Sequence, residues 1–459
     1  MNLLAKTRLL LTALLILPAT MGCTGEGGGR DPQLIPEDRF ATDAVVTDYF
    51  TKQLDHMTIE TPPEQMSREA ISAQASEIER TKQQIWTLWK DANQARLATC
   101  GISEATPIDK PVWTLPNGDK MKFAPFAKGT KPAGGYPMII HLHGGGKYPD
   151  TPIPWGSEVN EDEWFQSLRL SADYKDAPCL CFVPRMPDDR KGRWYHMPLT
   201  FVYRRAYQLG VLSGLVDPDR FYITGISEGG YGTVRVGPFM PDYFAAVGCL
   251  AAATKPTDAL RGLRNTPFRM EVGEDDTMYG RNVYVRLWQD RLNELASQNS
   301  GNYPHEVIIQ KGRDHYINYY GMTPWLLTHK RNARPNHVTY VYHSIVPDEP
   351  DAMEAFSAGV YCLDLRALRP DSKDARLSID LIKKDNTYTL TTEPLSGNVT
   401  GKIGLYIDDV DYTKPITVLY NGKTVFRGKL FPNRGAMVDA VALFGDPKRI
   451  FSSKLAIDL

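Results

Sequence analysis

A glycine-flanked serine after an apolar run is the sequence feature that most constrains the fold. Residues 225–229 read Gly-Ile-Ser-Glu-Gly, and the run Phe-Tyr-Ile-Thr directly before them is typical of a buried strand. The residues after Gly230 can begin a helix. Glycines on both sides of the serine allow a sharp turn between strand and helix without Cβ clashes. The pattern therefore predicts a strand–turn–helix unit that exposes the hydroxyl of Ser227 above a sheet, as a nucleophile.

The surrounding region, residues 100–335, alternates apolar runs with amphipathic stretches. This alternation is typical of an α/β fold with a mostly parallel sheet flanked by helices. The predicted strands are 137–142, 180–183, 221–224, 268–272 and 306–310, and the predicted helices are 199–215, 231–240 and 284–298.

Two further segments flank this region. Residues 37–99 are polar with helical spacing, and Ile78, Ile85, Leu88 and Trp89 fall on one helical stripe, so we expect helices, with Trp86 and Trp89 packed on the main domain. Residues 336–459 alternate short strands with turns, which predicts a small all-β, sandwich-like domain. Within it, Asn421-Gly422 between two strand runs is a strong hairpin signal.

The N-terminus has the features of an export signal. Residues 1–23 combine basic residues, a short apolar run and a small residue before Cys23, which resembles a bacterial lipobox. The apolar run is too short to span a bilayer as a mature helix. We therefore expect lipidation of Cys23, a flexible Gly-rich tether over residues 24–36 and an exported lipoprotein, anchored to a membrane in the periplasm or at the cell surface.

Charge and cysteine content exclude several functions. Lys and Arg total 53 and Asp and Glu total 54, so no global positive field favours nucleic acid. Cys179 and Cys181 point to the same face of a predicted strand, which favours buried thiols over metal ligands because nothing nearby completes a ligand set. His141 and His143 also lack further ligands at metal-site spacing. We predict no metal and no cofactor.

A second glycine-rich motif follows the strand at 137–142. His143 is followed by Gly144, Gly145 and Gly146. Acyl transfer develops an oxyanion that needs preorganised donors, and residues without side chains let backbone N–H groups approach it. Gly144 and Gly145 are the predicted donors, together with the N–H of Glu228.

An acid and a base complete the predicted site. Asp276 follows the strand at 268–272 and is our choice for the carboxylate, with Asp275 as the alternative. His315 follows the strand at 306–310 and is the predicted general base; His196 and His305 have poorer context. The order Ser, Asp, His is that of α/β-hydrolases.

Together these motifs resemble the α/β-hydrolase superfamily. Within it, the chain is similar to exported serine esterases and predicted peptidases related to dienelactone hydrolase, polyhydroxybutyrate depolymerase and prolyl oligopeptidase catalytic domains. The resemblance covers most of residues 80–459. It implies Ser227 as nucleophile, Asp276 as acid, His315 as base and Gly144 and Gly145 in the oxyanion loop. Glu228 is a departure, since many relatives carry a small or neutral residue there. The motifs that carry the resemblance read HLHGGG, VDPDRFYITGISEGGYGT, GLRNTPFRMEVGEDDTMYGRN, GRDHYINYYGMTPWLLTHKRNARPNHVTY and DYTKPITVLYNGKTVFRGKL.

One aromatic loop has two interpretations. Trp194, Tyr195 and His196 lie between two predicted strands, with several arginines nearby. The loop either lines an acyl or sugar site or is a packed surface loop.

Three functions remain open. The first is a serine hydrolase that cleaves small-molecule or polymeric carboxylic esters through an acyl-enzyme. The second is a peptidase of prolyl oligopeptidase type, disfavoured because only about 100 helical residues precede the catalytic region, where such enzymes have a propeller domain. The third is a binding lipoprotein on an inactive hydrolase fold, which the complete set of motifs disfavours.

Overall fold

The computed structural model describes residues 37–54, 59–342 and 357–459. The predicted signal at 1–23, Cys23 and the tether at 24–36 lie outside these ranges, and the predicted segment boundaries stay predictions. Within the described ranges, no helix is both long and apolar enough to cross a membrane. The five cysteines in the same ranges are all unpaired thiols.

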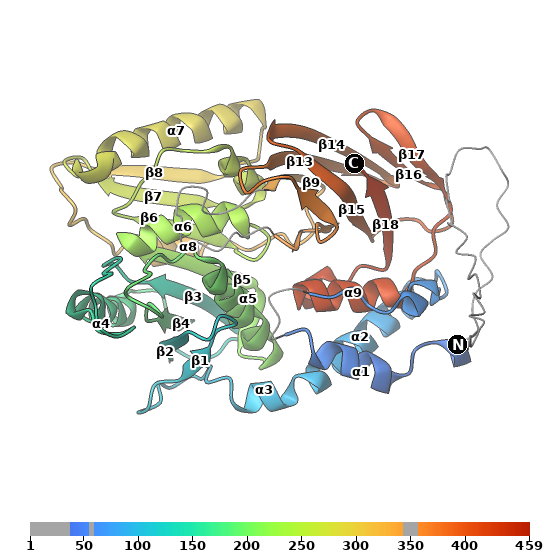
Figure 1. Ribbon diagram of the computed structural model, residues 1–459, viewed down its shortest axis with the longest axis horizontal. Coiled ribbons are helices and arrows are strands. Elements are labelled where there is room, and N and C mark those ends of the chain that lie inside the picture. Colours follow the sequence, from blue (N-terminus) through green and yellow to red (C-terminus); the bar gives the residue numbers. More distant parts are fainter. Residues whose placement is uncertain (1–36, 55–58, 343–356) are drawn as a thin grey trace, which may run out of the picture. The chain divides into compact units, whose positions relative to one another are not determined.

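An eight-stranded sheet forms the centre of residues 112–310, in the order β1-β2-β4-β3-β5-β6-β7-β8 (Figure 1). β1 and β2 run antiparallel to their neighbours, and β3 to β8 are parallel to one another. β3 is buried along its whole length, because helices cover both of its faces. The strands are β1 (Val112–Thr114), β2 (Lys120–Lys128), β3 (Tyr136–Leu142), β4 (Cys179–Pro184), β5 (Val216–Ile226), β6 (Ala246–Leu250), β7 (Phe268–Gly273) and β8 (His305–Gln310).

Successive residues of β3 belong to different apolar clusters, which separates the two faces of the sheet. Met138 and Ile140 pack in the cluster that contains residues of α5 (Met197–Leu212), α6 (Glu228–Phe239) and α7 (Arg281–Gln298). Ile139 packs in the cluster with α4 (Glu158–Asp173) and α8 (Met322–Leu326). This two-sided cover is what the alternation of strands and helices predicts.

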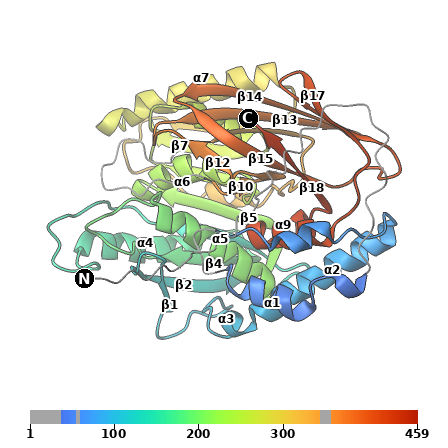
Figure 2. The same ribbon diagram turned by 45° about the vertical axis from the view of Figure 1, so that its right-hand side comes forward.

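Two further sheets lie in residues 337–458 (Figure 2). One has the order β17-β16-β14-β13-β9, and the other has the order β10-β11-β15-β12, with β18 also paired to β15. The predicted hairpin is present: β16 and β17 are antiparallel, and Asn421 and Gly422 at their turn both have positive φ. The strands are β9 (His337–Tyr342), β10 (Gly359–Val360), β11 (Leu363–Asp364), β12 (Leu368–Pro370), β13 (Arg376–Lys384), β14 (Thr387–Ser396), β15 (Val399–Ile407), β16 (Ile416–Tyr420), β17 (Lys423–Gly428) and β18 (Ser453–Asp458).

The predicted C-terminal β domain is present, and it contains one helix that the sequence analysis did not predict. Helix α9 (Arg434–Phe444) interrupts the strands, and all eleven of its residues are buried. Its sequence is apolar around most of its circumference, so it has no amphipathic stripe that would distinguish it from a buried strand run.

The N-terminal segment is helical, as predicted. It contains α1 (Asp43–Thr51), α2 (Ala75–Ala92) and α3 (Gln94–Ala98), and α2 packs against α1 and α9. Ile78, Ile85 and Trp89 of α2 are buried, and Trp89 meets Phe50 edge to face. Short 3-10 helices lie at Glu37–Arg39, Glu64–Arg68, Asp258–Asn265, Met278–Gly280 and Pro447–Arg449.

Direct contacts join this segment to the start of α9. Ala70 forms a β-bridge with Asn433, and the N–H of Ile71 donates to the carbonyl of Pro432 at 2.8 Å. Arg434 forms ion pairs with Glu69 at 3.1 Å and with Asp43 at 3.0 Å. The first and last parts of the described chain therefore share one interface.

A charged network ties β11, β15, α9 and β18 together. Arg366 donates to Asp364 at 2.7 Å and to Asp439 at 2.7 Å, and Lys454 reaches both carboxylates. The hydroxyl of Tyr406 donates to Asp439 at 2.7 Å. Burial raises the pKa of Asp364, but the bonds from Arg366 and the charges of Lys454 and Arg366 outweigh it and lower the pKa to about 2.

This network predicts an acid-sensitive contribution to stability. Because the folded pKa of Asp364 lies below the ordinary 3.8, its contribution is present above pH 4 and is lost as pH falls through 2. The free energy at stake is on the order of 2 kcal/mol. Urea denaturation of wild type and Asp364→Asn from pH 2 to pH 7 should give a stability difference that shrinks in acid. Asp458→Asn, which alters an exposed carboxylate, is the control; a difference independent of pH would contradict the prediction.

Candidate active site

Ser227 lies at the sharp turn between β5 and α6. Its backbone has φ 53° and ψ −112°, a conformation that residues with a side chain rarely adopt. The N–H of Ser227 donates to the carbonyl of Leu250 at 2.9 Å, which fixes the turn to β6. Gly229 packs so closely on the backbone of Leu142 that a Cβ there would overlap it. The geometry is the strand–turn–helix unit predicted from the sequence.

His315 and Asp276 reach Ser227 from the loops after β8 and β7. His315 Nε2 lies 3.0 Å from the hydroxyl of Ser227, and His315 Nδ1 lies 2.8 Å from Asp276 Oδ2. The strand register explains the meeting: Gly273 of β7 pairs with Gln310 of β8, so both loops leave the same edge of the sheet. Asp276 is buried, whereas Ser227 and His315 are partly exposed. This relay can move a proton away from the serine hydroxyl.

An arginine that sequence reasoning missed supports the carboxylate. Arg281 at the start of α7 is buried, and its Nη1 lies 3.0 Å from Asp276 Oδ1 and 3.1 Å from His315 Nδ1. Its Nε donates to the hydroxyl of Tyr231 at 2.6 Å, and its guanidinium lies over the rings of Tyr231 and Tyr279. Arg281 therefore holds one oxygen of Asp276 while the other oxygen faces the imidazole.

The glycine loop after β3 lies beside the serine turn. Leu142 of β3 pairs with Gly225 of β5 in a parallel register, so the two loops start from neighbouring positions. His143 fixes the first peptide of the loop. Its Nε2 accepts from the N–H of Met186 at 3.0 Å, so the ring proton is on Nδ1 and donates to the carbonyl of Gly144 at 2.7 Å.

His143 is therefore a neutral structural group. Burial and the charge of Arg185 lower its pKa to about 3. In a trans peptide, the N–H points opposite to the carbonyl. The N–H of Gly145 is consequently directed away from the imidazole of His143, as expected for a donor to an oxyanion.

Asn160 of α4 holds the rest of the loop. Its Oδ1 accepts from the N–H of Gly146 at 2.9 Å, and its Nδ2 donates to the carbonyl of Gly146 and to Asp189. Gly145 has φ +91°, and a Cβ there would overlap Asn160, so only glycine fits. Asp189 in turn pairs with the fully buried Arg185 at 2.6 Å. The loop is thus held rigid before any substrate binds.

Glu228, which follows the nucleophile, is buried beside Arg193. Arg193 Nη1 lies 2.8 Å from Glu228 Oε2. Glu228 is the first residue of α6, and the first N–H groups of a helix have no partner within the helix. The side-chain charge is thereby compensated, while the backbone position is that expected for an oxyanion donor.

The aromatic loop has a packing role at two of its three positions. Trp194 is fully buried, its Nε1–H donates to the carbonyl of His143 at 2.9 Å, and its ring packs on that of His143. Tyr195 is also buried, with Arg235 over its ring. His196 lines a cavity of about 110 Å³ with residues such as Leu115 and Lys191. Through Trp194, this loop packs against the residue that begins the oxyanion loop.

The rival acid and base lie elsewhere. Asp275 is exposed, and the imidazole of His315 meets Asp276 instead. His305 begins β8, at the edge of the parallel sheet opposite to Ser227, and its Nε2 lies 3.0 Å from Asn293 Oδ1.

His141 and the thiols of Cys179 and Cys181 are buried, with the two sulfurs 3.9 Å apart. No metal-holding group of three or more His, Cys, Asp or Glu occurs in the described part of the chain.

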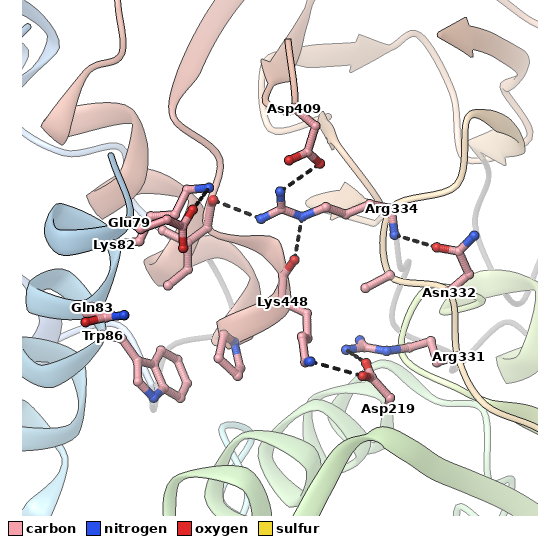
Figure 3. A pocket seen from close by; sticks show the side chains of 13 residues that line it. Glu79, Lys82, Gln83, Trp86, Asp219, Arg331, Asn332, Arg334, Asp409 and Lys448 are labelled. Atoms are coloured by element: carbon pink, nitrogen blue, oxygen red, sulfur yellow. Dashed lines mark hydrogen bonds and ion pairs between the residues drawn. The ribbon is translucent and has the colours of Figure 1, made fainter. Parts of the chain in front are cut away.

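A separate cavity of about 520 Å³ lies between α2, residues 331–334 and residues 447–450 (Figure 3). Trp86 forms part of its wall and is only partly buried, unlike Trp89. The charged groups at its rim pair with one another: Lys448 with Asp219 at 3.2 Å, and Arg334 with Asp409 at 3.1 Å. The lining of this cavity does not include Ser227, so the candidate catalytic residues lie outside it.

The strand order, the antiparallel β1 and β2 and the serine turn after β5 give this chain the fold of the α/β-hydrolase superfamily. The chain matches no protein-family model and no curated protein. Among solved structures, it is similar to a thermostable esterase, at 19% identity and a TM-score of 0.34, over 48% of this chain and 62% of that one.

Two other solved structures show comparable similarity. A ferulic acid esterase is 18% identical, with a TM-score of 0.34 over 49% of this chain and 98% of that one. Dipeptidyl peptidase 4 from Porphyromonas gingivalis is 15% identical, with a TM-score of 0.35 over 49% of this chain and 36% of that one. At this level of similarity, the assignment of the fold rests on the strand order and register.

Proposed function

We propose that this chain is a serine hydrolase that cleaves carboxylic esters. The observation that carries the proposal is the relay in which His315 lies 3.0 Å from Ser227 and 2.8 Å from Asp276. His315 takes the proton of Ser227 as the hydroxyl oxygen attacks the acyl carbonyl, and the N–H groups of Gly144, Gly145 and Glu228 stabilise the oxyanion. His315 then gives this proton to the departing alkoxide, and the alcohol leaves. Water attacks the acyl-enzyme with neutral His315 again as base, the acid leaves, and His315 returns a proton to Ser227.

Hydrolysis of a panel of substrates tests the ester assignment. The panel contains p-nitrophenyl esters of short to long acids, feruloyl and acetyl-sugar esters, and a prolyl amide. Turnover of the esters that depends on Ser227 is the result expected from this proposal. Turnover of the amide alone would favour the peptidase of prolyl oligopeptidase type. A folded protein without turnover on any substrate would favour a binding lipoprotein.

The same proposal places the enzyme outside the cytoplasm, on a lipid anchor. It rests on the export signal and on Cys23 in the sequence. Incorporation of labelled palmitate into wild type, and its loss in Cys23→Ser, is the expected result; equal labelling of both would overturn the anchor without affecting the ester chemistry.

A further inference from the structure

A carboxylate that the relay does not use lies against the oxyanion loop. Glu163 is on α4, one turn after Asn160, and residues three apart lie on the same side of a helix. Asn160 bonds to Gly146, and a Cβ on Gly144 would overlap Glu163 Oε2. The half-buried side chain of Glu163 therefore lies beside Gly144, one of the two proposed loop donors.

The same carboxylate is within electrostatic reach of the catalytic base. Burial raises the pKa of Glu163 above its ordinary value, and the charge of His315 offsets only part of that shift. The charge of Glu163 also contributes to raising the pKa values of Tyr148 and Tyr319, after burial. Glu163 thus lies against the oxyanion loop and close enough to His315 for the two charges to interact.

Neighbouring carboxylates have arginine partners, and Glu163 does not. Asp189 and Glu161 pair with Arg185, and Glu228 pairs with Arg193. Across the ranges that the structure describes, no lysine or arginine forms an ion pair with Glu163. A carboxylate withdrawn from water without a cation costs free energy, and a bound cation would offset that cost.

The position of this charge also affects the reaction. An ionised carboxylate beside Gly144 repels the negative charge that develops on the carbonyl oxygen in the transition state. A positive charge on the substrate, held between Glu163 and the oxyanion, would cancel that repulsion. Cationic substrates are therefore favoured at binding and again in the transition state.

We propose that Glu163 is a specificity-determining residue that binds an ammonium group close to the scissile carbonyl, so that the preferred substrates are esters of amino acids. This inference rests on the proposed function, because it concerns the same Ser227-dependent hydrolysis. The ammonium group donates hydrogen bonds to the Glu163 carboxylate, and the carbonyl oxygen lies against the N–H groups of the loop.

Steady-state hydrolysis of three matched methyl esters tests the proposal. β-Alanine methyl ester carries the ammonium group, methyl butanoate is its neutral isostere, and monomethyl succinate carries a carboxylate. For wild type, we expect kcat/KM to be at least tenfold higher for the β-alanine ester than for methyl butanoate, and lowest for the succinate ester. In Glu163→Gln, the ratio of kcat/KM for the β-alanine ester to that for methyl butanoate should fall below twofold.

Asp162→Asn is the matched control, because it removes an exposed carboxylate from the adjacent position of α4. It should retain the wild-type preference. Ester turnover that depends on Ser227 but shows no ammonium preference in wild type, or a preference that survives in Glu163→Gln, would overturn this inference alone. Absence of turnover on all three esters and on p-nitrophenyl acetate would overturn both the inference and the proposed function.

Discussion

Replacing Ser227 with alanine is expected to lower kcat on p-nitrophenyl acetate by about 10⁶-fold, since the nucleophile is removed and the relay has no proton to accept. The turn itself should persist, because the N–H of Ser227 bonds to Leu250 through the backbone. Active-site titration with a fluorophosphonate, together with steady-state rates, measures the effect.

Ser297→Ala is the control, because this serine is exposed on α7 and its hydroxyl donates only to the carbonyl of Glu294. It should keep wild-type turnover and react with the fluorophosphonate. If Ser227→Ala keeps more than a few per cent of wild-type turnover, another residue is the nucleophile and the assignment of the relay is wrong.

Replacing Asp276 with asparagine is expected to lower kcat by about 10⁴-fold with little change in KM. An amide nitrogen cannot accept the Nδ1 proton, so the imidazole would turn or change tautomer and Nε2 would no longer accept from Ser227. The loss of kcat should also exceed that caused by an ordinary polar substitution, because the charged Arg281 would remain buried beside a neutral side chain. Steady-state rates on p-nitrophenyl acetate measure it, with thermal unfolding as a check on the fold.

Asp275→Asn provides a control of the same chemistry at the next position. Asp275 is exposed, so its variant should stay within twofold of wild type. The opposite ranking of the two variants would make Asp275 the acid and would contradict the geometry around His315.

The serine turn was predictable because backbone geometry demands particular residues there. The strained φ of Ser227 and the contact between Gly229 and Leu142 leave little freedom in the flanking positions, so a short motif after a strand identifies the turn. The choice between Asp275 and Asp276 had no comparable signal. It depends on a tight turn in which the N–H of Asp276 bonds to the carbonyl of Gly273, and sequence does not fix which carboxylate then points inward.

Helix α4 was missed because its buried face is largely polar. Asn160, Ser167 and Ser171 are buried alongside Trp164, so apolar spacing does not mark the inward side. Asn160 and Glu163 were missed with it. Arg281 was missed for a related reason: an arginine at a helix start resembles a surface charge until aromatic rings and a carboxylate surround it.

The interface between residues 69–71 and the start of α9 has a consequence for the order in which the chain matures. During synthesis the N-terminal helices emerge first, yet their partner, Arg434 with its neighbours, emerges almost last. The part of α2 that packs against α9 therefore stays uncovered while the central sheet assembles, whereas the part that packs against α1 can be covered early. Ribosome-bound chains that stop before residue 433 should be cleaved by a protease at residues 69–71, and released full-length chains should resist cleavage there.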